Sequence, residues 1–227
     1  MRCKQRGVVV SKIGADLASG GTLPMVAAQR PDQLRASFKD NLRSLDVEQV
    51  PVVNLRRLDG TSHIRAAGAQ VVDIEDQLEV MAAMRDEGKI GAIGLSSVTL
   101  DGLRRALPAS IACVQNEYSL LNRTDEQILQ LCVTEGIAWV PFFPLGGAFA
   151  GMPKVTDEPV AASGAQALGV SPAQVGLAWL LHRAPNVLLI PGTTSTAHLD
   201  ENVAAGALDG NDPSVVALDD FQPGAVA

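Results

Sequence analysis

The chain has 227 residues, of which 47% are hydrophobic and 19% are charged, and its formal net charge is −7 at pH 7. These values allow one large globular domain or two small ones, and the negative charge argues against nucleic acid and anionic membranes as partners. No apolar run approaches the ~18 residues that a membrane span requires. The cysteines, Cys3, Cys113 and Cys132, show no paired or metal-ligand spacing, so we expect plain thiols in a cytoplasmic protein without a metal site.

Strand and helix patterns then alternate along the chain. The first strand begins almost at the N-terminus, and a Gly/Ala-rich loop follows it. Apolar and β-branched runs predict strands at residues 8–14, 50–55, 90–95, 112–118, 137–143 and 187–190. Apolar residues at helical spacing, preceded by capping residues or prolines, predict helices at residues 31–45, 73–87, 100–107, 124–135, 159–168 and 171–183, and a last one from about Ala197.

This alternation predicts an α/β fold with parallel strands and right-handed crossovers. Polar residues gather at the carboxyl ends of several strands, which is typical of a (β/α)8 TIM barrel, whereas a Rossmann sheet would carry an early G-x-G-x-x-G turn that is missing here. Six strand–helix units are visible where a barrel needs eight, so we expect a single domain, residues 1–227, truncated at its N-terminus to about six βα units, strands 3–8 of the barrel. The open sheet edges would favour self-association.

Residues 186–202 carry the most distinctive local pattern. A predicted buried strand, residues 187–190, ends at Pro191 and Gly192, a hydroxyl-rich turn follows, and a helix opens near Ala197. Hydroxyls and unpaired amides at a helix start, just past the carboxyl end of a parallel strand, suit a phosphate or another anion. The alternative is an ordinary turn whose Thr and Ser residues only cap the helix.

Lys12 lies at the carboxyl end of the first predicted strand. Burial there would lower its pKa and allow it to act as acid, base or Schiff-base former. The alternative is a solvated lysine at a strand end.

Short motifs along almost the whole chain resemble the aldo-keto reductases, and most of all the bacterial branch that includes pyridoxal reductase (pyridoxine 4-dehydrogenase). They occur in the family's order: Ser-Lys-Ile-Gly at 11–14, Val-Val-Asn-Leu-Arg at 52–56, Ile-Gly-Leu-Ser at 93–96, Cys-Val-Gln-Asn-Glu-Tyr at 113–118, Val-Pro-Phe-Phe-Pro-Leu-Gly-Gly at 140–147 and Ile-Pro-Gly-Thr-Thr-Ser-Thr-Ala-His-Leu-Asp-Glu-Asn at 190–202. The resemblance implies a barrel that binds NADPH across the carboxyl ends of its strands and reduces a small-molecule carbonyl.

By this resemblance, the nicotinamide carboxamide would contact Ser96, Ser97 and Gln115, with Ser97 standing where many members have Asn. Phe142 would stack on the nicotinamide ring, although it could also be a core aromatic residue. The backbone of Leu145 and Gly146 would run beside the pyrophosphate.

The adenosine end of the cofactor is expected on the last motif. Gly192, Thr193 and Thr194 would meet the ribose phosphate, and Glu201 and Asn202 the adenine. His198 stands where many relatives carry Arg, so it would hold a 2′-phosphate less firmly, and NADPH is favoured over NADH only narrowly. The alternative for His198 is a solvent-facing histidine on a helix.

The family's catalytic set is an Asp, a Tyr, a Lys and usually a His. Lys12 matches the Lys, and Arg56 falls at the usual His position, where it could polarise a carbonyl or form a structural salt bridge. The Asp and Tyr would come from sequence upstream of Met1, and Tyr118 is expected to be structural. A reductase lacking its general acid would lose roughly 10²–10⁴-fold in rate.

Three functions therefore remain open. The first is reduction of an aldehyde, for which the branch suggests pyridoxal, with impaired activity in this chain. The second is binding of NADP(H) without turnover, as a remnant or as part of an assembly. The third is a barrel lyase or isomerase that uses Lys12 as a Schiff base and residues 190–202 to hold a phosphate.

Overall fold

The computed structural model describes residues 7–18, 25–59, 64–147 and 151–222. Two compact units make up the chain, Met1–Gln115 (unit 1) and Asn116–Ala227 (unit 2), and each is described by itself. Of the cysteines and histidines of the sequence, Cys3 and His63 lie outside the described residues. No helix in the described ranges is long and apolar enough to cross a membrane. The expectation of a single domain stays a prediction.

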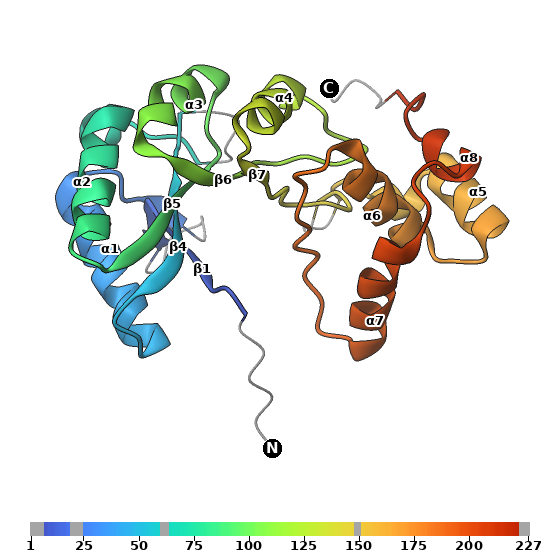
Figure 1. Ribbon diagram of the computed structural model, residues 1–227, viewed down its shortest axis with the longest axis horizontal. Helices are drawn as coiled ribbons and strands as arrows, with labels where there is room; N and C mark the ends of the chain where they lie inside the picture. Colours follow the sequence, from blue (N-terminus) through green and yellow to red (C-terminus); the bar gives the residue numbers. More distant parts are fainter. Residues whose placement is uncertain (1–6, 19–24, 60–63, 148–150, 223–227) are drawn as a thin grey trace. The chain divides into compact units, whose positions relative to one another are not determined.

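Unit 1 is built on parallel strands. They are β1 (Val10–Ile13), β4 (Val50–Arg56), β5 (Ile90–Ser96) and β6 (Ile111–Gln115), paired in that order. Figure 1 shows α1 (Pro31–Leu45), α2 (Ile74–Asp86) and α3 (Leu100–Ala106) along one face of this sheet, between successive strands in the sequence. The parallel α/β prediction is therefore confirmed in this unit.

Local signals explain where the first helix begins and ends. Pro31 occupies its first turn, where the missing N–H costs nothing, and Leu34 and Phe38 bury the same face. Asp46 ends the helix in the left-handed conformation (φ 53°), and its N–H donates to the carbonyl of Arg43. The predicted range 31–45 agrees with α1.

A hairpin occupies the region after β1 that the sequence predicts as a loop. β2 (Ala15–Leu17) and β3 (Met25–Ala27) pair antiparallel, with Ala15 opposite Ala27. Gly14 leads into this hairpin with φ +107°, and a Cβ there would overlap the carbonyl oxygen of Arg56. Glycine suits this backbone angle and this close approach. The loop prediction missed the antiparallel pair of β2 and β3.

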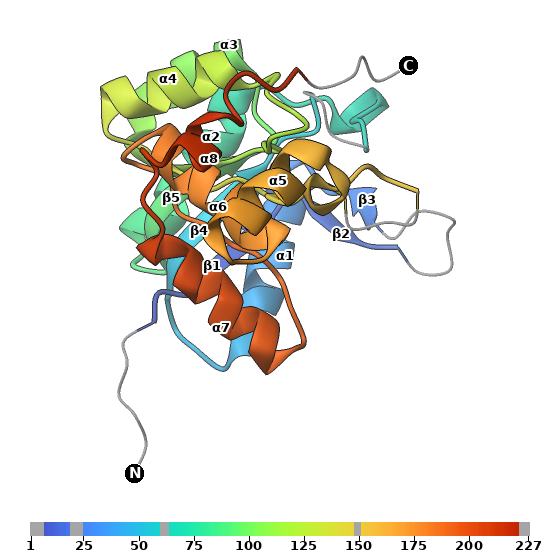
Figure 2. The same cartoon turned by 90° about the vertical axis from the view of Figure 1, so that its right-hand side faces the viewer.

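Unit 2 is mainly helical. Its elements are β7 (Ala138–Trp139), α4 (Glu126–Glu135), α5 (Pro159–Leu168), α6 (Pro172–Arg183), α7 (Thr196–Ala204) and α8 (Pro213–Val216). Figure 2 shows α5, α6 and α8 packed together, with α7 beside α6. Short 3₁₀ turns complete the two units: η1 (Gly68–Gln70), η2 (Leu107–Ala109), η3 (Val155–Asp157) and η4 (Ala205–Ala207).

The prediction of a buried strand at residues 187–190 is wrong. Val187 is buried and bridges Trp139, and the amide of Leu188 donates to the Trp139 carbonyl (2.8 Å), but Leu188 and Ile190 are 58% and 44% exposed. Its partner strand, β7, is also shorter than expected and covers only part of the predicted range 137–143. Pro141 has no N–H to donate, so it cannot extend a ladder beyond Trp139.

Candidate functional site

Lys12 is tied to the sheet of unit 1 by a hydrogen bond between side chains. It lies on β1 opposite Asn54 of β4, and its Nζ donates to Ser96 Oγ at 2.9 Å. Ser96 ends β5 and is fully buried. The side chain of Lys12 therefore points along the sheet toward the carboxyl ends of neighbouring strands, as the sequence predicts.

The electrostatic setting of Lys12 favours its neutral form. Burial and, to a lesser extent, the Arg56 cation lower its pKa to about 7, and Cys113 acts in the opposite direction. Desolvation disfavours the charged form of an amine, and a like charge nearby does the same. Near neutral pH this lysine therefore exists as a mixture of amine and ammonium.

A line of buried side chains continues from Lys12 across the sheet. Asn54 is 1% exposed, donates from Nδ2 to Gln115 Oε1 (3.3 Å), and accepts at Oδ1 from the Cys113 thiol (3.2 Å). Gly94 on β5 makes room for this arrangement, because a Cβ there would collide with Asn54 Oδ1 and lie 2.7 Å from Cys113 Sγ. Sequence reasoning did not assign Asn54 or Cys113 to the site, although a polar residue inside the apolar run of β4 is a usable signal.

The three residues expected at the nicotinamide carboxamide lie together at the ends of β5 and β6. Ser97 follows Ser96, and its amide donates to the Gln115 carbonyl at 3.1 Å. Ser97 is buried, and its backbone is in the left-handed conformation (φ 54°), which Asn tolerates better than Ser. The side chains of Ser96 and Gln115 are engaged by Lys12 and Asn54, respectively.

Arg56 lies at the end of β4, as predicted. Its Nη1 contacts Met25 Sδ at 3.0 Å, and burial lowers its pKa from the usual value. Among the residues described by the structure, no carboxylate forms an ion pair with Arg56, which does not support the salt-bridge alternative. The guanidinium remains charged at any physiological pH.

A buried network that the sequence did not predict holds the backbone on both sides of this site. The Gln29 side chain donates to the carbonyls of Gly14 (2.5 Å) and Arg56 (2.9 Å). Gln77, fully buried on α2, donates to Gln29 and accepts from Arg57. The amide side chains thereby link the ends of β1 and β4 to α2.

In unit 2, the predicted motif at 190–202 forms a helix start beside a cavity. Ser195 caps α7 by accepting from the His198 amide (3.4 Å), and Thr193 Oγ1 accepts from the Ser195 amide (3.1 Å). A cavity of about 360 Å³ is lined by several of the predicted cofactor residues, namely Leu145, Gly192, Thr193, His198, Glu201 and Asn202. Thr194 is exposed and does not line it. The predicted helix near Ala197 is confirmed as α7.

A second cavity, also of about 360 Å³, is lined by further predicted residues of unit 2, but not by Thr194. Phe142 and Gly146 line it, and Leu145 and Gly192 line both cavities. Phe142 is half-buried and meets Phe143 edge to face, with 5.1 Å between ring centroids. Gly146 has φ +92°, and a Cβ there would overlap the Pro153 carbonyl oxygen, so glycine is required by the local fold whether or not a pyrophosphate lies beside it.

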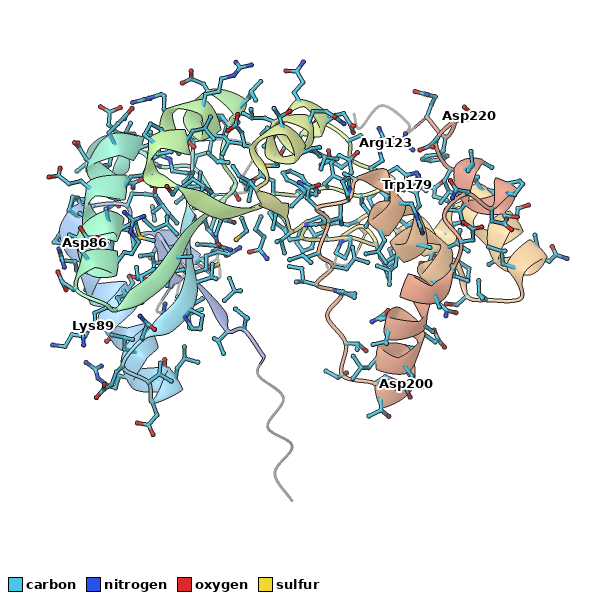
Figure 3. All side chains as sticks on the ribbon, in the orientation of Figure 1. Asp86, Lys89, Arg123, Trp179, Asp200 and Asp220 are labelled. Atoms are coloured by element: carbon cyan, nitrogen blue, oxygen red, sulfur yellow. The ribbon has the colours of Figure 1, made fainter. Side chains whose placement is uncertain are left out.

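Tyr118 has the structural role that the sequence predicts. It is fully buried, and its hydroxyl bonds to Glu126 and accepts from Arg183 at 3.3 Å. Burial and the Glu126 carboxylate raise its pKa to about 12. The neighbouring Trp179 lies parallel to it, with Arg123 4.7 Å above the Trp179 ring (Figure 3). These contacts make Tyr118 part of a packed side-chain cluster and do not favour a role as proton donor.

The predicted site residues thus fall into two sets. Unit 1 gathers the catalytic and carboxamide residues, and unit 2 gathers those expected along the rest of the cofactor. Within the described ranges, no group of three or more His, Cys, Asp or Glu side chains is placed to hold a metal ion.

Known proteins with a similar sequence are oxidoreductases. Pyridoxine 4-dehydrogenase of Escherichia coli is 44% identical over 212 residues, which cover 93% of this chain and 70% of that protein. An uncharacterized oxidoreductase of Schizosaccharomyces pombe is 35% identical over 179 residues, covering 78% of this chain and 54% of the relative.

Solved structures show the same fold. Aldose reductase from Giardia lamblia superposes with a TM-score of 0.76 at 20% identity, covering 94% of this chain and 71% of that one. An aldo-keto reductase from Klebsiella pneumoniae, solved in complex with NADPH, superposes with a TM-score of 0.74 at 22% identity, covering 99% and 73%. The α/β fold therefore matches aldo-keto reductase barrel structures, of which this chain covers 71% and 73%. The truncation to about six βα units, strands 3–8 of the barrel, stays a prediction.

A family model matches almost the entire chain. It is described as the aldo/keto reductase family and covers residues 4–222. Together with the relative of 44% identity, this match places the chain in a family whose members carry their chemistry at the carboxyl ends of barrel strands, where Lys12, Arg56, Ser96 and Gln115 lie. The chain belongs to the aldo-keto reductase family.

Proposed function

We propose that this chain carries an NADP(H)-dependent carbonyl reductase activity, which converts an aldehyde to an alcohol. The observation that carries the proposal is the cluster around Lys12 Nζ, where a buried amine, the Ser96 hydroxyl and the Arg56 cation meet at the ends of parallel strands. The similarity to pyridoxine 4-dehydrogenase makes pyridoxal the first aldehyde to test.

In this proposal the residues of unit 1 act on the carbonyl and on the reacting end of the cofactor. Lys12 exchanges a proton near neutral pH, and Arg56 supplies a fixed positive charge that steadies negative charge on the carbonyl oxygen. Ser96, Ser97 and Gln115 would hold the carboxamide, and Phe142 of unit 2 would offer a ring face to the nicotinamide. NADPH, when bound, supplies the hydride.

In the same proposal, the two cavities of unit 2 would take the pyrophosphate and adenosine of the cofactor. A phosphate would lie at the start of α7, where Thr193 lines the first cavity, with Thr194 next to it in the sequence. Glu201 accepts from Ser171 Oγ (3.3 Å), which fixes a carboxylate at the cavity wall for an adenine amino group. Leu145 and Gly146 would run beside the pyrophosphate, with Gly192, His198 and Asn202 completing the adenosine end.

The test separates binding from turnover. NADPH is titrated by fluorescence, and its absorbance is then followed with pyridoxal present. We expect binding and an aldehyde-dependent decay, with Lys12→Met keeping the binding but losing roughly 10²–10⁴-fold in rate. Lys89→Met is the matched control, since Lys89 is exposed on unit 1 (Figure 3).

Two outcomes would count against the proposal in different ways. No NADPH binding would overturn it. Tight binding without any decay would support the binding-only alternative, in which the chain holds NADP(H) and turns nothing over.

A further inference from the structure

The Lys12 amine differs from a surface lysine in three ways that the structure shows together. Its side chain is half-buried, its Nζ is 2.9 Å from the Ser96 hydroxyl, and the Arg56 cation acts on it from the neighbouring strand β4. Lysines become nucleophiles in proteins where loss of water around the amine or a second cation keeps it unprotonated. Both causes are present here.

We propose that Lys12 forms a reversible imine with the carbonyl carbon of an aldehyde that enters this site. The aldehyde class rests on the proposed reductase function, whereas the nucleophile rests on the burial of Lys12, its hydrogen bond to Ser96 and the nearby Arg56 cation. Pyridoxal is the probe, because the aldehyde on its aromatic ring gives a conjugated imine.

The reaction balances without an oxidant or a reductant. The Nζ lone pair attacks the carbonyl carbon and forms an N–C bond, which gives a carbinolamine. Loss of water then breaks the C–O bond, with the aldehyde oxygen and two hydrogens that started on Nζ leaving together. The Ser96 hydroxyl, already in contact with Nζ, is placed to accept one of these protons and pass it to the departing oxygen.

The surroundings of Lys12 set how reactive it is near neutral pH. Burial and then Arg56 lower its pKa to about 7, and Cys113 on β6 acts in the opposite direction. From α1, the Asn41 amide contacts the Lys12 carbonyl at 3.5 Å. A lysine with an ordinary pKa of about 10.4 is neutral in roughly one molecule in 2,500 at pH 7. At pH 7 a much larger fraction of Lys12 is neutral, so Lys12 should react with the aldehyde faster than the surface lysines do.

The experiment traps the imine in the absence of NADPH. The full chain is incubated with pyridoxal at pH 7, reduced with borohydride and mapped by peptide mass spectrometry. We expect modification of Lys12 at least about tenfold above that of the exposed Lys39, Lys89 and Lys154. Modification spread evenly over the lysines, or missing at Lys12, would overturn the proposal.

Two variants test the assigned groups. Lys12→Arg should lose the main adduct, whereas Lys89→Arg should keep it. Arg56→Met removes the cation, so the pH at which half of Lys12 is trapped should rise, and an unchanged midpoint would contradict the part assigned to Arg56.

The trapping result is independent of reductase activity. If Lys12 is trapped but NADPH is never consumed, the imine stands and the proposed function falls. If the chain reduces pyridoxal and Lys12 is not trapped, the reverse holds.

Discussion

The two units present their candidate site residues in opposite ways. In unit 1, Asn54 and Ser96 are almost completely buried, and their side chains touch other side chains of the same sheet. In unit 2, α7 has no fully buried residue, and His198 is exposed beside an open cavity. One set of groups is part of a core and the other belongs to a surface.

This difference has an energetic meaning. Polar groups buried in a sheet lower the free energy of unfolding by their desolvation cost, because they lose water in every folded molecule. Exposed groups at a helix start change a ligand's affinity and leave the free energy of unfolding nearly unchanged. Substitutions of the buried residues in unit 1 should therefore change the free energy of unfolding. Substitutions of exposed residues on α7 should change only the affinity for the cofactor.

The largest expected effect lies in the buried network of unit 1. Gln77→Met keeps the volume but removes one acceptor of Arg57, which keeps Asp59 and the Val72 carbonyl, and leaves the buried Gln29 carbonyl without its Gln77 donor. This should lower the free energy of unfolding by about 3 kcal/mol. Urea denaturation measures it. Gln127→Met, at an exposed position on α4, should change it by less than about 0.5 kcal/mol. Equal effects would contradict the contrast between the units.

Lys12→Met should make the protein more stable at neutral pH. Between pH 7 and 10.5 the unfolded state binds the Lys12 proton and the folded state does not, so the free energy of unfolding of the parent rises with pH in this range. Methionine removes the penalty, and we expect a gain on the order of 2 kcal/mol at pH 7 that shrinks toward pH 10. Denaturation at several pH values tests this, and a gain independent of pH would contradict it.

His198→Arg should act on binding alone. A guanidinium holds a 2′-phosphate better than imidazole, so the Kd for NADPH should fall up to about tenfold, which corresponds to about 1.4 kcal/mol. The Kd for NADH, which lacks that phosphate, should stay the same, and so should the Tm. An equal change for both cofactors would place His198 away from the 2′-phosphate.

The smallest expected effect concerns backbone conformation. Ser97→Asn places a residue that tolerates positive φ at a left-handed position and should stabilise unit 1 by about 0.5 kcal/mol. Ser110→Asn, at another left-handed serine (φ 59°), should stabilise similarly without changing NADPH affinity. If only the Ser97 variant changes that affinity, Ser97 is assigned to the cofactor.

Local signals predicted the helices well. The sequence placed a helix at 159–168, which agrees with α5, because Pro159 starts it and Gly169 ends it in the left-handed conformation. The helix at 171–183 followed from Ser171, whose hydroxyl accepts from the Gln174 amide in a capping box. Such signals lie within a few residues of the feature they determine.

Features that depend on a distant partner were not predictable in this way. The apolar run at 187–190 has strand composition, but its partner stops at Trp139, so it forms a single bridge. The same limit applies to the site, since the contacts of Gln29 with Arg56 and of Asn54 with Gln115 join residues far apart in sequence. The residue roles came from family resemblance, and those along the cofactor stay predictions.

Gly94 has a consequence for how this site can change. It sits on an inner strand of the unit 1 sheet, and the space above its Cα is filled by the amide of Asn54 and the sulfur of Cys113. Even alanine at this position would push the two flanking strands' side chains apart and cut the chain of contacts that runs from one to the other. The inner strand β5 therefore permits no side chain at position 94 unless its neighbours are rebuilt.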